Sequence, residues 1–339
     1  MSKHNLLAID LAKNVFQVCG MTQQNKVTFN KKLNRSEVME FMANQEPVEV
    51  AMEACYSSHY WARCFEAMGH TSKLLPAQHV TPFVRGNKSD RNDAMAIGEA
   101  ARRPNIIPVP IKSLGQQDIQ CLHRIREQHI AHRTGLSNQA RGLLSEYGVI
   151  SPKGHKSFCK LLREASQPET KAISLLLKTQ FNYIADEYNA HTDRIEGIDI
   201  TLKEIANHNP LCKILLSIPG IGIINATAIY SAIGDGSQFN NAREFAVWLG
   251  LTPKQFSSGD TFKSAGITKR GNRYLRKQLV HGARSALSRC KNKTNRVSNW
   301  ANKLIARRGF NKASVAMAAR MARTCWLLLN KREVYKQIN

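Results

Sequence analysis

The sequence lacks the features that mark membrane-embedded and secreted proteins. No run approaches the roughly 18 to 20 consecutive apolar residues that a membrane-spanning helix needs. The N-terminus has neither the long apolar region nor the cleavage site of a signal peptide. The cysteines show no CxxC pair and no zinc-ligand spacing, which favours reduced thiols. We therefore expect a cytoplasmic protein that makes no membrane contact.

Acidic residues are also scarce, above all near the C-terminus. The 339 residues contain 49 Lys and Arg against 25 Asp and Glu, a net charge of +24. Residues 261–339 contain 20 of the basic residues and a single acid, Glu333. Each neutralised phosphate releases counterions, so this surplus favours a polyanionic partner. The charges spread over several helical patterns rather than one amphipathic helix, which favours nucleic acid over a membrane surface.

The chain is long enough for two or three domains with apolar cores, since 42% of its residues are hydrophobic. The first hundred residues show three strand patterns, a helix, a strand, a helix and a strand, which predicts a mixed α/β sheet covered by helices. The strands are expected at residues 6–10, 15–21, 26–30, 48–52 and 72–75.

The pattern becomes helical beyond this region. Long helical stretches cover about residues 114–147 and 169–207, which predicts either a coiled-coil-like arm or a helical hairpin within one domain. In residues 215–233, PGIG lies between two helical patterns. This segment resembles a helix-hairpin-helix, whose turn holds a phosphate, although an ordinary glycine turn between core helices has the same pattern.

Four acids stand where they can share one site. Asp10 and Glu53 each close a strand pattern, and ligands bind at strand ends in open α/β sheets. Asp90 and Asp93 have the i, i+3 spacing that places both on one helix face. Four carboxylates suit a hard divalent cation such as Mg²⁺, with Mn²⁺ as an alternative, and hence phosphoryl transfer on nucleic acid.

Each acid also has an ordinary structural interpretation. Asp10 is a suitable turn residue after a strand, and Glu53 can pair with a nearby base. Asp90 can be a helix N-cap, with Asp93 favoured by the helix dipole. Three basic neighbours fit a site that meets a phosphate backbone: Arg85, Lys88 and Arg91.

A second group of candidate residues lies in the basic region. Ser257 and Ser258 precede Gly259 in a predicted loop, where a serine can be exposed as a nucleophile. A plain Ser/Gly turn is the alternative, and no histidine stands in this loop to act as a base. The basic residues closest to the loop, and the first candidates for nucleic-acid contacts, are Lys269, Arg270, Arg273 and Arg276.

Five motifs together resemble one known family. They are AIDLAKNVFQV, VAMEAC, KSDRNDAMAI, SIPGIGIINATAI and WLGLTPKQFSSGDTFKSAGITKRGNRYLRKQL. Their order and spacing over nearly the whole chain are similar to those of the DEDD-type transposases of bacterial insertion sequences, the IS one-ten and IS eleven-eleven group. This group is now described as bridge-RNA-guided recombinases.

The resemblance implies three regions. Residues 1–112 would form an RNase H-like, RuvC-like DEDD domain whose acids Asp10, Glu53, Asp90 and Asp93 bind Mg²⁺. Residues 113–208 would form a coiled-coil region, and residues 209–339 a mainly helical transposase domain. This last domain would supply a nucleophilic serine, for which Ser258 matches the Ser-Gly pair best and Ser257 is the alternative.

The resemblance also implies partners and a mechanism. The serine would attack a DNA phosphate and form a covalent protein–DNA intermediate. A serine of one subunit would meet the acids of another within a dimer or tetramer, at the nucleoid. A structured bridge RNA from the element would pair with donor and target DNA. Two alternatives stay open: a RuvC-like, structure-specific endonuclease without a covalent step, and a nucleic-acid-binding protein without chemistry.

Overall fold

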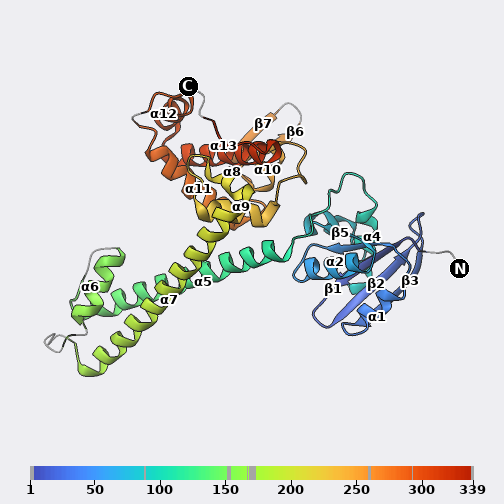
Figure 1. The fold of residues 1–339 in the computed structure, drawn as a ribbon, viewed down its shortest axis with the longest axis horizontal. Coiled ribbons are helices and arrows are strands. Elements are labelled where there is room, and N and C mark those ends of the chain that lie inside the picture. The colour runs from blue at the N-terminus through green and yellow to red at the C-terminus, as the bar shows by residue number, and fades with distance from the viewer. Residues whose placement is uncertain are drawn as a thin grey trace. The chain divides into compact units, whose positions relative to one another are not determined.

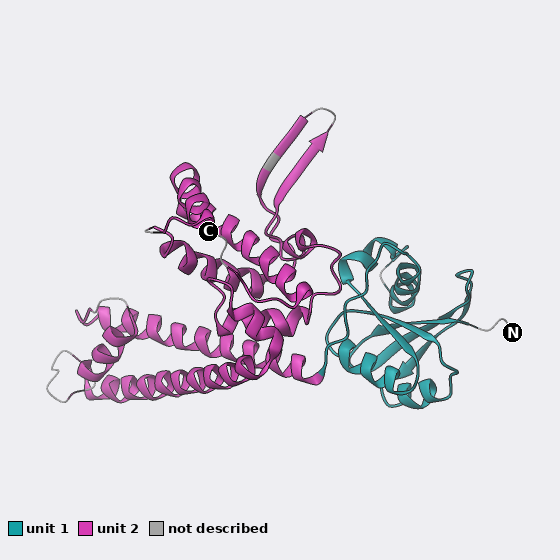
Figure 2. Cartoon of the chain, turned by 45° about the horizontal axis from the view of Figure 1, so that its top comes forward, with its two compact units in different colours: residues 1–113 teal, residues 114–339 magenta. Residues whose placement is uncertain are grey.

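The computed structural model of the chain describes residues 4–87, 89–150, 154–165, 167, 173–258, 261–291 and 293–336. The chain divides into two compact units, residues 1–113 (unit 1) and residues 114–339 (unit 2), drawn in different colours in Figure 2. No helix within the described ranges is long and apolar enough to cross a membrane.

Unit 1 is built on a five-stranded mixed sheet, as the sequence predicts. Its strands are β1 (Leu6–Leu11), β2 (Val15–Met21), β3 (Val27–Asn34), β4 (Glu49–Glu53) and β5 (Thr71–Leu75). The strand order is β3-β2-β1-β4-β5. Strands β1, β2 and β3 pair antiparallel, while β1 with β4 and β4 with β5 pair parallel. The central strand β1 therefore joins the antiparallel half of the sheet to the parallel half.

Helices cover both faces of this sheet (Figure 1). They are α1 (Val38–Ala43), α2 (Ser58–Ala67), α3 (Ala77–Val80), the 3-10 helix η1 (Thr81–Phe83) and α4 (Asp90–Ala101). One core gathers Leu7 and Ile9 of β1 with residues of α1 and α2. The other gathers Leu6 and Ala8 with residues of α4. This alternation is that of a strand buried on both faces.

Two long helices begin unit 2. They are α5 (Leu114–Ser145) and α7 (Leu175–His208), and they lie side by side (Figure 1). Arg126 of α5 donates two hydrogen bonds to Asp199 of α7, from Nε to Oδ1 at 2.5 Å and from Nη2 to Oδ2 at 3.1 Å. Helix α6 (His155–Ala165) packs at their far end, where Phe158 and Phe181 are fully buried.

The rest of unit 2 is a helical body with its own core. Its helices are α8 (Pro210–Leu216), α9 (Ile223–Ile233), α10 (Ala242–Trp248), α11 (Arg273–Ser288), α12 (Arg296–Arg308) and α13 (Phe310–Lys331). Helix α5 joins this body through His123, whose ring nitrogens lie 2.9 Å from the Tyr274 hydroxyl and 3.0 Å from Thr227 Oγ1. Burial lowers the pKa of His123 to about 4, so the ring is neutral in the folded protein at pH 7.

The serine-containing segment forms two strands, where the sequence analysis predicts a loop. Strands β6 (Pro253–Ser258) and β7 (Thr261–Ile267) pair antiparallel as a β-hairpin. All six residues of β6 are exposed. A loop is predicted because the segment is rich in Ser, Gly and Lys. The strands leave no apolar alternation in the sequence, because neither face of the hairpin is buried.

Close backbone packing fixes the two ends of this hairpin where they join the helical body. A Cβ added to Gly271 would lie 1.8 Å from the carbonyl oxygen of Trp248, so only glycine fits there. Arg276 Nη1 donates to the carbonyl oxygens of Leu249 at 2.9 Å and Arg270 at 3.0 Å. The two chain segments leaving the hairpin are thereby held together by one side chain.

Candidate functional site

The sheet register places Asp10 and Glu53 next to each other. Strands β1 and β4 run parallel, with Ile9 opposite Met52, so the next residues in register are Asp10 and Glu53. Neighbouring strands lie about 4.8 Å apart. The two carboxyl groups therefore stand at adjacent strand ends, as the sequence predicts for a ligand site at the edge of an α/β sheet.

Both carboxyl groups point to the face that α4 covers. Side chains alternate along a strand, so Asp10 shares a face with Leu6 and Ala8, and Glu53 shares one with Ala51. Leu6, Ala8 and Ala51 all belong to the core on the α4 side of the sheet. Asp10 and Glu53 themselves are half-buried.

Helix α4 begins at this same face and brings two further carboxyl groups. Its N-cap is Ser89, whose side chain accepts a hydrogen bond from the Asn92 backbone N–H at 3.3 Å. The alternative of Asp90 as N-cap is therefore wrong, because Ser89 has that role. Asp90 and Asp93 both lie in the first turn of α4. Asp90 also forms an exposed ion pair with Lys32 of β3 at 3.4 Å.

The other three acids act electrostatically on Asp10. The pKa of Asp10 is raised to about 6, first by burial and then by the negative charges of Asp93, Asp90 and Glu53. A hydrogen bond from the backbone of Leu11 opposes this rise. Where neighbouring negative charges raise the pKa of a carboxyl group, as at Asp10, a bound cation would relieve the repulsion.

Gln17 is a site residue that the sequence analysis missed. It lies on β2 directly opposite Asp10 and is 5% exposed. Its Nε2 donates to Asn30 Oδ1 at 2.5 Å, and Asn30 Nδ2 donates to the carbonyl oxygen of Arg91 in α4 at 3.1 Å. Gln17 Oε1 is buried and has no hydrogen-bond partner within the described part of the chain. The side-chain amides of Gln17 and Asn30 thus connect the start of α4 to the sheet. Gln17 Oε1 remains without a described hydrogen bond on the strand opposite Asp10.

The donor set fits a divalent metal in its chemistry. Carboxylate and amide oxygens are the ligands that Mg²⁺ and Mn²⁺ prefer, and the unused Gln17 oxygen adds to them. Within the described ranges, however, no group of three or more His, Cys, Asp or Glu side chains is arranged to hold an ion. Mg²⁺ sites commonly combine one or two carboxylates with waters and substrate phosphate. The arrangement therefore fits an ion shared with a substrate rather than a closed protein cage.

Cys55, just beyond Glu53, is a poor nucleophile. Burial, with the negative charges of Glu53 and Asp10, raises the pKa of the Cys55 thiol to about 11. The thiolate is the reactive form of cysteine, and it is scarcely populated at neutral pH. Cysteine chemistry beside the acids is therefore disfavoured.

The candidate serines lie in unit 2, on the β6–β7 hairpin. Ser257 pairs with Phe262 and Ser258 with Thr261 across the two strands. Both serines are exposed, so an external phosphate can reach either hydroxyl. Gly259, which follows Ser258 in the predicted Ser-Gly pair, lies outside the described residues.

The predicted nucleic-acid contacts differ in their surroundings. Arg85 and Arg91 are exposed in unit 1, and Lys88 lies outside the described residues. Three of the four predicted contacts in unit 2 are exposed: Lys269, Arg270 and Arg273. Arg276 is half-buried and holds the base of the hairpin through its Nη1. A nucleic-acid contact by Arg276 stays a prediction.

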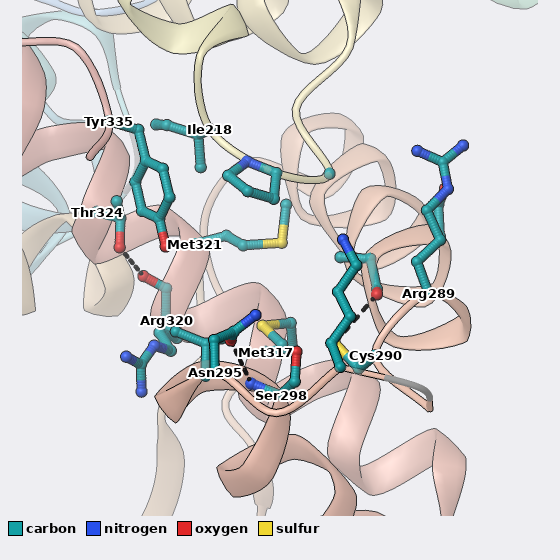
Figure 3. Close-up of a pocket in the computed structure, with 16 residues that line it drawn as sticks. Ile218, Arg289, Cys290, Asn295, Ser298, Met317, Arg320, Met321, Thr324 and Tyr335 are labelled. Atoms are coloured by element: carbon teal, nitrogen blue, oxygen red, sulfur yellow. Dashed lines mark hydrogen bonds between the residues drawn. The ribbon is translucent and has the colours of Figure 1, made fainter. Parts of the chain in front are cut away.

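The PGIG turn lies between α8 and α9 and packs closely against α11. A Cβ added to Gly282 of α11 would lie 2.2 Å from the carbonyl oxygen of Gly220. The pocket beside this turn is shown in Figure 3, with Met317 and Met321 inside it and the guanidinium groups of Arg289 and Arg320 turned away from these two side chains. Close packing explains Gly220 and Gly282, while a phosphate-binding helix-hairpin-helix stays a prediction.

Comparison with known proteins identifies the chain. A family model described as "Transposase", DEDD_Tnp_IS110, matches residues 7–149. A second, "Transposase IS116/IS110/IS902 family", matches residues 212–298. The transposase for insertion sequence element IS1111A of Coxiella burnetii is 39% identical over 336 residues, which cover 99% of this chain and 92% of that protein. The chain belongs to the IS110 family of DEDD transposases.

Other relatives agree with this assignment. A probable family 20 transposase of Pseudomonas aeruginosa is 39% identical over 97% of this chain and 98% of its own length. The pilin gene-inverting protein of Moraxella bovis is 24% identical over 82% of this chain and 81% of its own length. As a DEDD transposase, the protein is an enzyme of DNA strand transfer, which excludes a binding protein without chemistry. DEDD transposases generally use a divalent metal ion.

The two family matches cover the two candidate groups of residues. The four acids of unit 1 fall within residues 7–149, and both serines fall within residues 212–298. Each group therefore lies in a part of the chain that the IS110 family shares.

Proposed function

We propose that this transposase exchanges DNA strands between a donor and a target under the guidance of a structured bridge RNA encoded by its element. The observation on which the proposal rests is that β1 and β4 end side by side at Asp10 and Glu53, on the sheet face where the first turn of α4 carries Asp90 and Asp93. The strand order of unit 1, three antiparallel strands followed by two parallel ones, supports an RNase H-like, RuvC-like domain around these acids. The charge surplus supports a protein that binds both RNA and DNA.

In this proposal the acids hold Mg²⁺, or Mn²⁺ in its place. Asp10 and Glu53 bind from the sheet, Asp90 and Asp93 from the first turn of α4. When bound, the ion stabilises negative charge on the scissile phosphate and on the leaving oxygen. The amides of Gln17 and Asn30 keep the start of α4 in position, so that the carboxyl groups of the helix and the sheet stay together.

The nucleophile is Ser258, with Ser257 as the alternative. Serine Oγ attacks the DNA phosphorus, an Oγ–P bond forms, and one P–O bond of the DNA strand breaks. The serine proton is released and the departing DNA oxygen takes up a proton. Attack by the hydroxyl of a second strand then breaks the Oγ–P bond, joins the strands and returns a proton to serine. The exposed hairpin suits a hydroxyl that reaches a phosphate held elsewhere.

A covalent adduct is the direct test of this proposal. Labelled donor and target DNA are incubated with Mg²⁺ and RNA transcribed from the sequence flanking the gene, and the products are separated on a denaturing gel. We expect an RNA-dependent protein–DNA adduct that is lost in Ser258→Ala and kept in Ser257→Ala. Metal-dependent cleavage without an adduct would instead support the RuvC-like endonuclease that uses water.

A mixing experiment tests the composite site and the oligomer. We propose a dimer or tetramer in which a serine of one subunit meets the acids of another. Asp10→Asn and Ser258→Ala proteins, each inactive alone, are therefore expected to recover partial strand exchange when mixed, because some oligomers then contain one intact pair. Mixtures that stay inactive, although the two proteins assemble together, would contradict a shared site.

The basic residues of both units are proposed to bind phosphate backbones. In unit 1 they are Arg85, Lys88 and Arg91, and in unit 2 they are Lys269, Arg270, Arg273 and Arg276. The α8–α9 segment is proposed to add a helix-hairpin-helix contact through its turn. Changing Arg273 to Gln is expected to lower the slope of log affinity against log salt by about 1, because one fewer counterion is released.

A further inference from the structure

Two phenylalanines stand exposed on the β6–β7 hairpin. Phe256 is 60% exposed and Phe262 is 77% exposed. Figure 2 shows the hairpin extending away from the helical body of unit 2. Single exposed apolar residues are ordinary in proteins. Here two exposed aromatic rings lie on one projecting hairpin beside candidate catalytic residues, which indicates a binding surface.

The strand register assigns each ring to the face of one serine. Phe256 pairs with Lys263, Ser257 with Phe262, and Ser258 with Thr261. Paired residues share a face and successive residues alternate. One face therefore presents Phe256 with Ser258, two residues further along β6. The other presents Phe262 directly across from Ser257. Whichever serine attacks, an exposed ring stands beside it.

The surroundings of the rings favour nucleic acid over a protein surface. The other described side chains near them are polar or cationic, among them Lys254, Gln255, Thr261 and Lys263, all exposed. The core of a protein–protein interface is a continuous apolar patch from which charges are depleted. Isolated aromatic rings among lysines are instead typical of surfaces that bind single strands, where bases stack on the rings and cations meet the phosphates.

We propose that Phe256 and Phe262 stack on unpaired DNA bases next to the phosphate that the serine attacks. The proposal rests on the proposed strand exchange, in which bases beside the broken strand must leave their old partners before they pair with new ones. The rings replace part of the lost base stacking, and Lys254 and Lys263 neutralise the neighbouring phosphates. Phe256 and Phe262 are thus positioning residues for the reacting strand.

The test compares unpaired with paired DNA. The probe is a short duplex with a central unpaired stretch of about four nucleotides that includes one 2-aminopurine, whose fluorescence falls when it stacks. A fully paired duplex is the reference. The variants are the double change Phe256→Ala with Phe262→Ala and the conservative double change of both residues to Trp. Tyr183→Ala is the matched control, because Tyr183 is an exposed aromatic residue of α7, 60% accessible.

The expected results separate stacking from general DNA binding. The wild type, the Trp variant and Tyr183→Ala should quench the 2-aminopurine and bind the unpaired probe more tightly than the duplex. The double Ala variant should lose the quenching and at least about tenfold of that preference, while its duplex affinity stays within about threefold, because phosphate contacts are unchanged. Strand exchange should fall about tenfold or more in the double Ala variant and recover in the Trp variant.

Each other outcome also has a definite meaning. If the double Ala variant quenches the 2-aminopurine and prefers the unpaired probe like the wild type, the stacking proposal is wrong. The proposed function can still hold in that case, because the wild type can exchange strands without stacking by the rings. If the wild type forms no covalent adduct but its quenching depends on the rings, the proposed function fails and stacking stands. If the double Ala variant forms smaller oligomers without DNA and its quenching is unchanged, the rings contact another subunit, which overturns the proposal.

Discussion

Unit 1 and unit 2 hold their candidate reactive groups in opposite ways. In unit 1, Asp10 and Glu53 are half-buried at the ends of packed strands, on the sheet face that packs against α4. In unit 2, Ser257 and Ser258 lie on a hairpin whose β6 residues are all exposed. Carboxylates that share an ion need fixed positions, whereas a nucleophile that must reach a phosphate gains from extending away from its domain.

The two units also differ in charge. Unit 1 contains 14 Lys and Arg against 10 Asp and Glu, while unit 2 contains 35 against 15. The nearly balanced unit thus concentrates its acids at one point, and the basic unit spreads its charge over a helical body. In the proposed function, unit 2 would therefore supply most of the affinity for phosphates, and unit 1 would bind the metal ion.

The largest expected effect comes from removing one carboxylate of unit 1. Asp10→Asn should reduce strand exchange at least about 1000-fold, because in the proposed function it removes a metal ligand. The raised pKa of Asp10 favours folding while the group is protonated, and this contribution is lost as the pH rises through about 6. Without metal at pH 7.5, Asp10→Asn should therefore melt no lower than the wild type in a thermal scan.

The control for this change lies on the same helix as two of the acids. Glu99 of α4 is paired with Arg103 at 3.3 Å, away from the carboxylate cluster. Glu99→Gln should keep strand exchange within about twofold, because exposed ion pairs contribute little. If Glu99→Gln and Asp10→Asn lowered strand exchange equally, Asp10 would have no specific role, and the effect would come from the loss of any negative charge in unit 1.

The next effect tests the packing of unit 2. Gly282→Ala should lower the free energy of unfolding by about 3 kcal/mol, because the added Cβ meets the Gly220 carbonyl oxygen at 2.2 Å. Gly197→Ala on α7 is the matched control, since nothing lies within 4 Å of its added Cβ. That change should stabilise the protein by about 0.5–1 kcal/mol, the preference for alanine in a helix. Denaturant titration measures both, and equal effects would argue against the close approach of turn and helix.

A smaller effect is expected from the pH dependence of unit 2. His123 has a pKa of about 4 when folded and an ordinary value of 6.5, so its contribution to stability is lost as the pH falls from about 6.5 towards 4. The stability margin of the wild type over His123→Gln should shrink by about 2 kcal/mol between pH 7.5 and pH 4.5. Chemical denaturation at both pH values measures it. A margin that does not change with pH would mean that the ring is not buried neutral between α5, α9 and α11.

The smallest effect is expected from shortening the hairpin. Replacing residues 254–266 by a short Gly/Ser turn should change the melting temperature by no more than about 2 °C, because the side chains of β6 bury almost no surface. A much larger fall in melting temperature would show that the hairpin stabilises the helical body. The hairpin would then be a packed part of unit 2, like the strands of unit 1. Calorimetry on the full chain gives the answer.

The sequence was sufficient to predict a mixed sheet in unit 1 and the succession of its strands and helices along the chain, because buried strands leave periodic patterns. Gln17 was missed, since a polar residue within VFQVCGM gains meaning only from the register that sets it opposite Asp10. The β6–β7 hairpin was missed because an exposed strand pair has no apolar alternation. The contact of His123 with Thr227 joins residues 104 positions apart, and no local pattern predicts such a contact.

The β6–β7 hairpin can be replaced as a unit, because its base is fixed by contacts with the helical body. Arg276 and the close contact of Gly271 with Trp248 define where the hairpin joins the helical body, independently of what lies between its two ends. Strands of another length or composition can be grafted between these points without rebuilding the core. Chimeras that carry the hairpin of a relative therefore offer a way to alter which DNA junctions a transposase accepts, leaving the acids of unit 1 untouched.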